Sequence, residues 1–173
     1  MRIVGSSLSF RADPADEQIA RLVPLLKESA RAAESEGVVL GIENHIDFTS
    51  DQIARILDTV DSPGLAATFD SGNALRVFED PVEAVRRLAP RVVATHIKDI
   101  IAGRGSPRDW TFWPSVPVGR GLVDVAGVFD ALRAVGYAGM LCVELDNVAP
   151  PYNQQPEEEL VRQSILEMRK HAG

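Results

Sequence analysis

The sequence predicts an α/β fold built on a parallel β-sheet. Five short runs rich in apolar and β-branched residues alternate with longer stretches whose apolar residues recur at helical spacing. The short runs are apolar along nearly their whole length, which is typical of strands that are buried on both faces. Strands that are each followed by a helix indicate parallel βαβ units. This order of elements fits both a doubly wound sheet and a (β/α)8 barrel.

The first unit consists of a strand over residues 2–6 and a long helix. Asp13 and Pro14 predict the start of that helix, with aspartate as the N-cap and proline in the first helical position. Gly37 is expected to end the helix, because glycine adopts the left-handed conformation that closes many helices. Pro24 interrupts the apolar repeat, so we expect a kink or two consecutive helices at that point.

The second and third units each begin with a strand that ends on an acidic residue. Residues 38–43 form the second predicted strand, and Thr49 with Gln52 resembles a capping box that starts the following helix. Residues 65–69 form the third predicted strand, and Asp70 follows directly. Both strands are apolar until the final charged residue.

The last two units follow the same pattern around a long loop. Asp80 precedes a proline and predicts a helix start, and residues 92–95 form the fourth strand. Asp124 is expected to cap the helix after the loop, and residues 140–143 form the fifth strand. A final helix is predicted from about residue 157 to residue 170.

Composition excludes several classes of protein. The chain has 173 residues, of which 45% are hydrophobic and 25% charged, and a net charge of −7, which suits one globular domain. The acidic balance disfavours nucleic-acid binding, and no apolar stretch approaches the roughly 18–20 residues that span a bilayer. The single cysteine, Cys142, excludes an internal disulfide and is expected to be a small buried residue. These features favour a cytoplasmic protein without membrane or nucleic-acid partners.

Four of the five predicted strands end on a side chain that binds divalent metals. These residues are Glu43, Asp70, His96 and Glu144. In parallel α/β folds the ligand site lies at the carboxyl ends of the strands, where three carboxylates would repel each other without a cation. The set suits one divalent ion, with Mn²⁺ expected first and Mg²⁺, Co²⁺ or Zn²⁺ as alternatives. Taken singly, each residue also has an ordinary explanation, as a helix cap, a solvated charge or a hydrogen-bonded core histidine.

Motifs around these residues resemble those of the sugar phosphate isomerase/epimerase family, which belongs to the xylose-isomerase-like TIM barrels. The motifs are Gly41-Ile42-Glu43-Asn44-His45, Thr68-Phe69-Asp70-Ser71-Gly72-Asn73, Thr95-His96-Ile97-Lys98-Asp99, Gly119-Arg120-Gly121-Leu122-Val123-Asp124 and Val143-Glu144-Leu145. Their order and placement together are specific, although each motif alone is modest evidence. The resemblance covers essentially the whole chain, from about residue 2 to the last helix.

The resemblance implies both a metal site and a reaction. The metal ligands of the family fall on Glu43, Asp70, His96 and Glu144, and the two glutamates double as acid and base on opposite faces of the substrate. One glutamate would remove a proton from a carbon beside a carbonyl, the metal would stabilise the enediolate, and the other would return a proton. This reaction isomerises or epimerises a keto sugar or a related derivative.

Three further residues are predicted to contact the substrate. Asn73 and Lys98 lie close to the ligands in sequence and are expected to orient substrate hydroxyls. For Lys98, an ion pair with Asp99 or another acid at the rim is an equal alternative. His45 either contacts the substrate or braces Glu43.

The long loop after the fourth strand carries two tryptophans, Trp110 and Trp113. Aromatic rings that lie over a sugar site often stack on the apolar face of the sugar, so the two residues are candidates for a lid. A packing cluster that serves only to hold the loop is an equal alternative.

The length of the chain departs from the family pattern. A (β/α)8 barrel typically needs about 250 residues, and the motifs align this chain with strands 4 to 8 of such a barrel. We therefore expect residues 1–173 to form a single domain, the C-terminal portion of a partial (β/α)8 barrel. The chain is then either truncated or a natural partial barrel that self-associates, because open edges at residues 2–6 and 140–143 favour association.

Several functions remain open from the sequence. A metal-dependent isomerase or epimerase of a keto sugar is the first expectation. Inosose dehydratases of the same superfamily use similar ligands to eliminate water, and a catalytically incomplete remnant would bind metal without turnover. Endonuclease IV-type repair enzymes share the fold but need further metal ligands and a basic DNA face, which three histidines and a charge of −7 disfavour.

Overall fold

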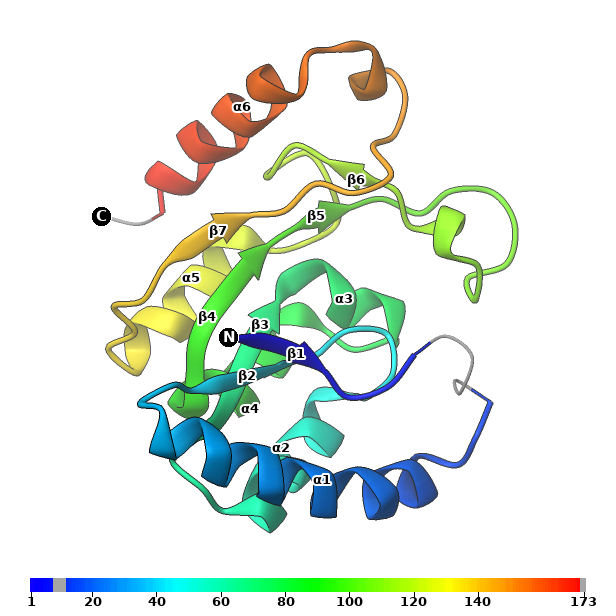
Figure 1. Ribbon diagram of the computed structural model, residues 1–173. Coiled ribbons are helices and arrows are strands. Elements are labelled where there is room, and N and C mark those ends of the chain that lie inside the picture. Colours follow the sequence, from blue (N-terminus) through cyan, green and yellow to red (C-terminus); the bar gives the residue numbers. More distant parts are fainter. Residues whose placement is uncertain (8–11, 172–173) are drawn as a thin grey trace.

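The computed structural model describes residues 1–7 and 12–171, in which five parallel strands form the main sheet (Figure 1). The strands are β1 (Arg2–Val4), β2 (Leu40–Glu43), β3 (Leu65–Asp70), β4 (Val92–Ile97) and β7 (Leu141–Val143). Their order in the sheet is β1-β2-β3-β4-β7, the same as their order along the chain. A doubly wound sheet reverses its strand order at a switch point, whereas the wall of a barrel does not. The described sheet is therefore barrel-like.

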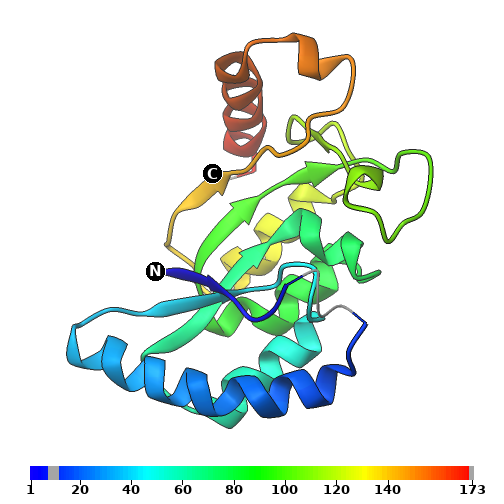
Figure 2. The same cartoon turned by 45° about the vertical axis from the view of Figure 1, so that its right-hand side comes forward.

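Helices cover the outer face of this sheet. They are α1 (Ala15–Ser35), α2 (Ser50–Val60), α4 (Pro81–Leu88) and α5 (Val125–Ala134), and each packs on the next, α1 on α2, α2 on α4 and α4 on α5. The short helix α3 (Ser71–Arg76) follows β3 directly. The last helix, α6 (Glu157–Arg169), lies beyond β7 at the opposite end of the molecule from α1 (Figures 1 and 2).

Alternation along each strand separates an apolar outer face from a polar inner face. Ile42, Phe69 and Ile97 belong to the apolar core beneath the helices. On the inner face, the residues in register across the strands are Val4 with Glu43, Glu43 with Thr68, Asp70 with His96 and His96 with Cys142. The inner face of the sheet therefore carries the charged residues that the sequence places at the strand ends.

Most of the predicted helix signals are confirmed. Thr49 and Gln52 form a complete capping box at α2, and the side chains of Asp80 and Asp124 cap α4 and α5. Gly37 adopts a φ of +66° just after α1, as the predicted C-terminal glycine requires.

The expectation for the start of α1 is wrong. Pro14, not Asp13, is the N-cap residue, and no side chain caps this end; the carboxylate of Asp13 pairs with Arg21 instead. The helix continues through Pro24 as one element, so the alternative of two consecutive helices is excluded. Burial of Ile19 and Leu26 on either side of Pro24 offsets the loss of one backbone hydrogen bond.

The long loop after β4 contains regular structure that the sequence pattern did not predict. Its ends pair as a small antiparallel ladder between β5 (Asp99–Ile100) and β6 (Ser115–Val116). A 3-10 turn at Trp110–Phe112 lies between them, and two further 3-10 turns occur at Ala89–Arg91 and Tyr152–Gln154. The pairing of β5 with β6 therefore holds the two ends of the loop together.

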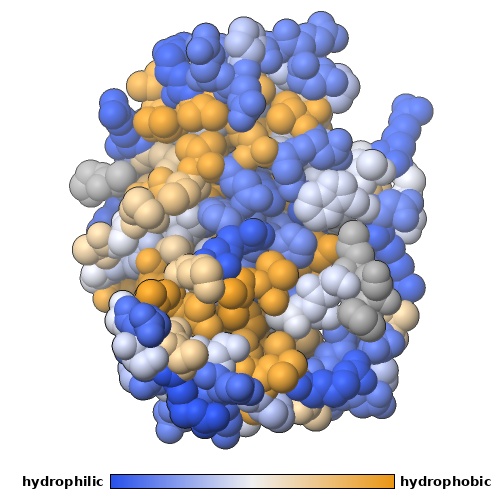
Figure 3. Space-filling view, viewed as in Figure 1, coloured by the Kyte–Doolittle hydropathy of each residue, from blue (hydrophilic) through white to orange (hydrophobic). Residues whose placement is uncertain are grey.

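β1 and β7 are the edges of the sheet, as expected. β1 is mostly exposed, with Val4 at 44%, and Cys142 in β7 is half-buried, so the prediction of a buried cysteine is wrong because its strand lies at an open edge. Figure 3 shows apolar side chains around β1 and beneath α6 on either side of a hydrophilic centre. Among the described residues, no helix has the length and apolar character needed to cross a membrane.

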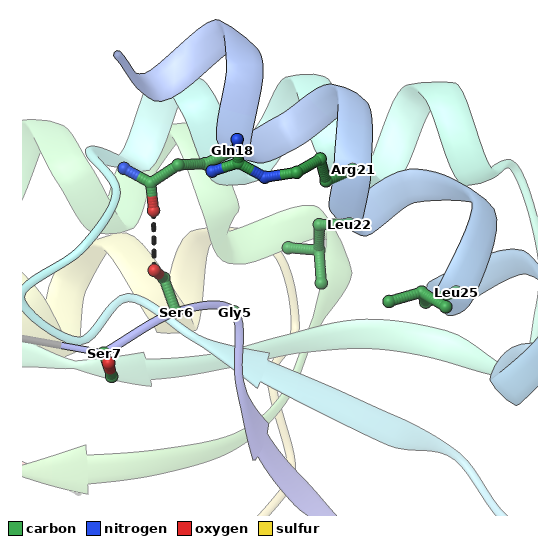
Figure 4. Close-up of a pocket in the computed structure, with 7 residues that line it drawn as sticks. All are labelled: Gly5, Ser6, Ser7, Gln18, Arg21, Leu22 and Leu25. Atoms are coloured by element: carbon green, nitrogen blue, oxygen red, sulfur yellow. Dashed lines mark hydrogen bonds between the residues drawn. The ribbon is translucent and has the colours of Figure 1, made fainter. Parts of the chain in front are cut away.

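A pocket of about 310 Å³ lies between the end of β1 and the first half of α1 (Figure 4). Ser6 closes one side by donating a hydrogen bond of 2.6 Å to Gln18, and Leu22 and Leu25 supply the apolar wall. Leu25 is 62% exposed, so this groove is open to solvent at the β1 edge.

Candidate metal centre

The structure brings the four predicted ligands together at one end of the sheet. Glu43 ends β2, Asp70 ends β3, His96 lies in β4 and Glu144 directly follows β7. One possible ligand atom from each residue lies within 4.8 Å of all the others. Glu43 and Asp70 are fully buried, whereas His96 and Glu144 are partly exposed. Four parallel strands in sequential order position the cluster, since their carboxyl ends meet at the same edge.

His96 lies between the two glutamates. Its Nδ1 is 3.0 Å from Oε1 of Glu43 and 2.7 Å from Oε2 of Glu144. The other oxygen of Glu43 pairs with the guanidinium of Arg2 from the neighbouring strand β1. The two carboxylates thus approach one imidazole nitrogen from β2 and from β7, on opposite sides of β3 and β4.

Two buried carboxylate oxygens in the cluster face charged side chains and accept no backbone hydrogen bond. Oδ1 of Asp70 accepts hydrogen bonds from the backbone N–H groups of Gly72 and Asn73, at 2.8 and 2.9 Å. Oδ2 of Asp70 and Oε2 of Glu144 are buried without a well-directed hydrogen bond, although Nζ of Lys98 lies 3.2 Å from Oδ2 and Nδ1 of His96 lies 2.7 Å from Oε2. Buried carboxylate oxygens that face only charged side chains have the capacity to bind a cation. Together with one imidazole and three carboxylates, they fit a divalent cation.

Lys98 is a second cationic side chain beside these carboxylates. Its Nζ lies 3.2 Å from Asp70, 3.0 Å from Glu144 and 3.3 Å from Asp146, and the side chain is 1% exposed. The alternative of an ion pair with another acid at the rim is therefore confirmed, but the partner is not Asp99. In this structure the lysine ammonium neutralises carboxylates that converge on the candidate centre.

Asp99 serves the scaffold instead. Its Oδ1 accepts hydrogen bonds from the backbone N–H groups of Ile100 and Val123, and its Oδ2 accepts from Gly119 and Gly121. A Cβ at Gly121 would collide with this carboxylate, which explains the glycine at that position. The motif at residues 119–124 is thus folded around Asp99.

Burial and charge together shift the pKa values of the cluster. Burial raises the pKa of Asp70 to about 7, although Lys98 opposes the shift. Hydrogen bonds to Glu144 and Glu43 raise the pKa of His96 to about 10. Burial alone would raise the pKa of Glu144, but His96 and Lys98 hold it well below its usual range. Burial would likewise lower the pKa of Lys98, but the surrounding carboxylates raise it above its ordinary value.

Asn73 and Arg76 extend the cluster along α3. Asn73 is fully buried; its Oδ1 accepts a hydrogen bond from Arg76, and its Nδ2 has no partner. The Arg76 guanidinium also donates to the Trp113 carbonyl at 3.0 Å, contacts Asp146 at 3.4 Å, and lies 3.9 Å from the centre of the Trp110 ring. Arg76 therefore fastens the long loop to the rim of the cluster.

His45 lies on the other side of the same loop. Its ring stacks on Trp110 with centroids 6.1 Å apart, and burial lowers its pKa, so the neutral form is favoured. In residues 1–7 and 12–171, no hydrogen bond or ion pair joins His45 to Glu43, so the brace alternative has no support in these contacts. The position of Trp110 between His45 and Arg76 supports its interpretation as part of a packing cluster.

Sequence reasoning missed four residues that contact this cluster. Arg2 pairs with Glu43, Asn44 hydrogen-bonds the backbone of Asp70, Arg76 holds the loop and Asp146 pairs with Lys98. Asn44 lies within one of the quoted motifs, and Asp146 follows Glu144 by two residues. Apart from this closeness to a predicted ligand, the sequence does not distinguish Asn44 and Asp146 from ordinary polar residues after a strand.

Comparison with known proteins places the chain in a family. A profile described as Xylose isomerase-like TIM barrel matches residues 2–171. A 3-oxo-isoapionate decarboxylase from Pectobacterium atrosepticum is 30% identical over 118 residues, which are 68% of this chain and 42% of the relative. An inosose dehydratase from Geobacillus thermodenitrificans is 24% identical over 152 residues, which are 79% of this chain and 51% of the relative.

A solved structure shares the fold. The crystal structure of the IOLI protein with a binding zinc atom superposes with a TM-score of 0.72 at 21% identity, over 92% of this chain and 58% of that one. The chain thus spans about half the length of the relatives that it matches. Because the family profile covers nearly all of its residues, the chain belongs to the Xylose isomerase-like TIM barrel family.

Proposed function

We propose that this chain carries the metal centre of a divalent-metal-dependent isomerase or epimerase of a keto sugar or sugar derivative. One observation carries the proposal: Glu43 and Glu144 reach the same nitrogen of His96 from opposite sides, and Asp70 completes the cluster with a buried oxygen that faces only side chains. In this proposal residues 1–173 are one domain that corresponds to strands 4 to 8 of the barrel, and the relatives' greater length supports that assignment.

Glu43, Asp70, His96 and Glu144 would hold one divalent ion, with Mn²⁺ as the first candidate and Mg²⁺, Co²⁺ or Zn²⁺ as alternatives. When bound, the ion supplies positive charge beside the oxygen that becomes negative as a proton leaves the adjacent carbon. The zinc atom named in the IOLI structure supports a metal in this fold. His96 must lose its proton to become a ligand, since imidazolium has no lone pair to donate.

The two glutamates would transfer the proton. One carboxylate accepts a proton from the carbon beside the carbonyl, and the other carboxyl group donates one, so the reaction has no net gain or loss of atoms. Proton transfer by a positioned side chain contributes roughly 10²–10⁴-fold to a rate. The unpartnered Nδ2 of Asn73 and the ammonium of Lys98 are donors suited to substrate oxygens, and His45 lies at the rim beside them.

Two alternative functions follow from the comparisons. The inosose dehydratase relative supports a lyase that removes a proton and then eliminates water from the neighbouring carbon. The share of each relative that the chain covers, 42% and 51%, supports a catalytically incomplete module that binds metal without turnover. A small-molecule sugar or polyol would be the partner of the lyase. Self-association through the open edges of the sheet can be measured for either alternative.

The test uses the purified chain loaded with Mn²⁺ and a panel of D-fructose, D-tagatose and an inosose in D₂O. An isomerase or epimerase incorporates deuterium beside the carbonyl and yields an isomeric sugar, whereas a dehydratase yields an unsaturated product. Glu144→Gln should abolish either reaction and leave the fold unchanged by circular dichroism. Tight Mn²⁺ binding without deuterium incorporation would favour the incomplete module, and failure to bind any divalent ion below millimolar concentration would overturn the metal-centre proposal.

A further inference from the structure

Asn44 is a buried polar residue that the proposed reaction does not use. It directly follows Glu43 and is 1% exposed. Its Nδ2 donates a hydrogen bond to the carbonyl of Asp70, and its Oδ1 accepts one from the N–H of Asp70, both at 2.8 Å. A side-chain amide that both donates to and accepts from one residue reproduces the pair of bonds that a neighbouring β-strand would make.

This contact begins where the sheet ladder stops. The last residue pair between β2 and β3 is Glu43 with Thr68, so the backbone of β2 no longer pairs with β3 at Asp70. The amide of Asn44 continues the pairing to Asp70 through a side chain. The two segments therefore stay together at the level where Glu43 and Asp70 project into the cluster.

The remaining contacts of Asp70 explain why this tether matters. Oδ1 is fixed by the N–H groups of Gly72 and Asn73, which follow it in α3. These bonds orient the carboxylate relative to its own helix but not relative to β2. Asn44 supplies the link to β2 and thus sets the position of Asp70 with respect to Glu43.

We propose that Asn44 is a positioning residue of the metal centre, which fixes the relative placement of two of the four ligands. This inference rests on the proposed metal site. Residues that orient metal ligands typically change metal affinity about 10–100-fold when removed. A purely structural role for Asn44 would instead lower stability without a selective effect on metal binding.

The experiment compares Mn²⁺ binding by the full chain, followed by the electron paramagnetic resonance signal of free Mn²⁺, with urea unfolding of the metal-free chain. Asn44→Ala should weaken Mn²⁺ binding about 10–100-fold. Thr49→Ala is the matched control, because it removes the capping box of α2 just downstream and has no bond to the cluster. It should lower the urea midpoint and leave the Mn²⁺ affinity unchanged.

A double variant gives a second readout that a structural role would not move. In an Asp70→Ala background, Asn44→Ala should have little further effect on Mn²⁺ affinity, because the group that it positions is gone. Mn²⁺ binding by Asn44→Ala within twofold of the unmodified chain would overturn the inference. If Asn44→Ala does not fold, Asn44→Gln, which keeps the amide but displaces it by one methylene, takes its place with the same expected loss.

The outcome for the unmodified chain separates the two proposals. Absence of Mn²⁺ binding by the folded, unmodified chain would refute the metal centre itself. Tight binding by the unmodified chain and by Asn44→Ala alike would refute only the role of Asn44.

Discussion

Asp70 ends strand β3 and Asp99 begins strand β5 at the same end of the molecule, yet the surroundings of these two buried acids differ. Both are fully buried, and burial raises the pKa of each carboxyl group. Each oxygen of Asp99 accepts two backbone N–H groups, whereas Asp70 has one oxygen bonded in this way and one that lies 3.2 Å from the ammonium of Lys98. A carboxylate saturated by backbone donors holds a loop together, and a carboxylate with an oxygen left over has capacity for a ligand.

The same difference extends to the neighbours of each acid. The partners of Asp99 are backbone amides whose positions are set by the chain. The partners of Asp70 on its open side are Lys98 and, beyond it, Glu144 and His96, which are side chains that a bound cation could replace. Substitution of Asp99 should therefore mainly lower stability, whereas substitution of Asp70 should mainly lower metal affinity.

The largest expected effect is a loss of stability in Asp99→Asn. The amide would place an NH₂ group against N–H donors and remove a charged acceptor from a buried site. Hydrogen bonds to a buried charged group contribute roughly 1.5–3 kcal/mol each, so a loss of roughly 3–5 kcal/mol in the free energy of unfolding is expected. Urea unfolding measures it, and a loss below about 1 kcal/mol would contradict the scaffold role of Asp99.

Asp70→Asn should show the opposite profile. Its Oδ1 can still accept from Gly72 and Asn73, but the buried Lys98 loses one of its three carboxylate partners, so the metal-free stability should fall by roughly 1–3 kcal/mol, less than in Asp99→Asn. Mn²⁺ affinity should fall by about 100-fold or more, since a ligand is lost. Isothermal titration calorimetry on both variants checks this, and equal metal affinity in Asp70→Asn and the unmodified chain would refute the comparison.

Two glycines beside these sites differ in the neighbours that an added Cβ would meet. A Cβ at Gly121 would collide with the Asp99 carboxylate and the Ile100 carbonyl, whereas a Cβ at Gly72 would meet the aliphatic stem of Lys98. Overpacking against fixed backbone typically costs roughly 1–3 kcal/mol, so Gly121→Ala should lower the free energy of unfolding by that amount. Gly72→Ala should cost less, because a lysine stem can shift. Thermal and urea unfolding of both variants test this order.

The pH dependence of the metal-free chain provides a smaller effect. The folded pKa of His96 is about 10, above its unfolded value, so the stability it contributes is fully present below pH 6.5 and is lost as the pH rises toward 10. The slope should reach at most about 1.4 kcal/mol per pH unit. His96→Gln should flatten the profile between pH 7 and 10, and an unchanged slope in that variant would show that His96 is not responsible.

Much of the fold could be predicted because its signals are local. The five strands, the capping box at Thr49 and the left-handed Gly37 follow from periodicity and from residues a few positions apart. The local pattern left open whether Pro24 divides α1, and the continuous helix depends on tertiary packing that such a pattern does not contain. The ladder between β5 and β6 was missed because two-residue strands carry almost no periodic signal.

Some residues of the candidate site could likewise be predicted from the sequence, and others could not. Glu43, Asp70, His96 and Glu144 were found because sequential parallel strands bring their ends to one edge, so position along the chain translates into position in space. The roles of Asn44 and Asp146 depend on contacts across strands, at separations of 26 and 48 residues from Asp70 and Lys98. No spacing rule distinguishes Asp99 from Asp70, since both are acids next to a strand.

If these four side chains hold one divalent ion, a crystal of the chain soaked in Mn²⁺ should show that ion between them. We expect one anomalous scattering peak per chain, in contact with Glu43, Asp70, His96 and Glu144 together. The ammonium of Lys98 should then have moved away from Asp70 and Glu144. A crystal without such a peak, or with manganese bound only elsewhere, would show that the four side chains do not form a metal centre.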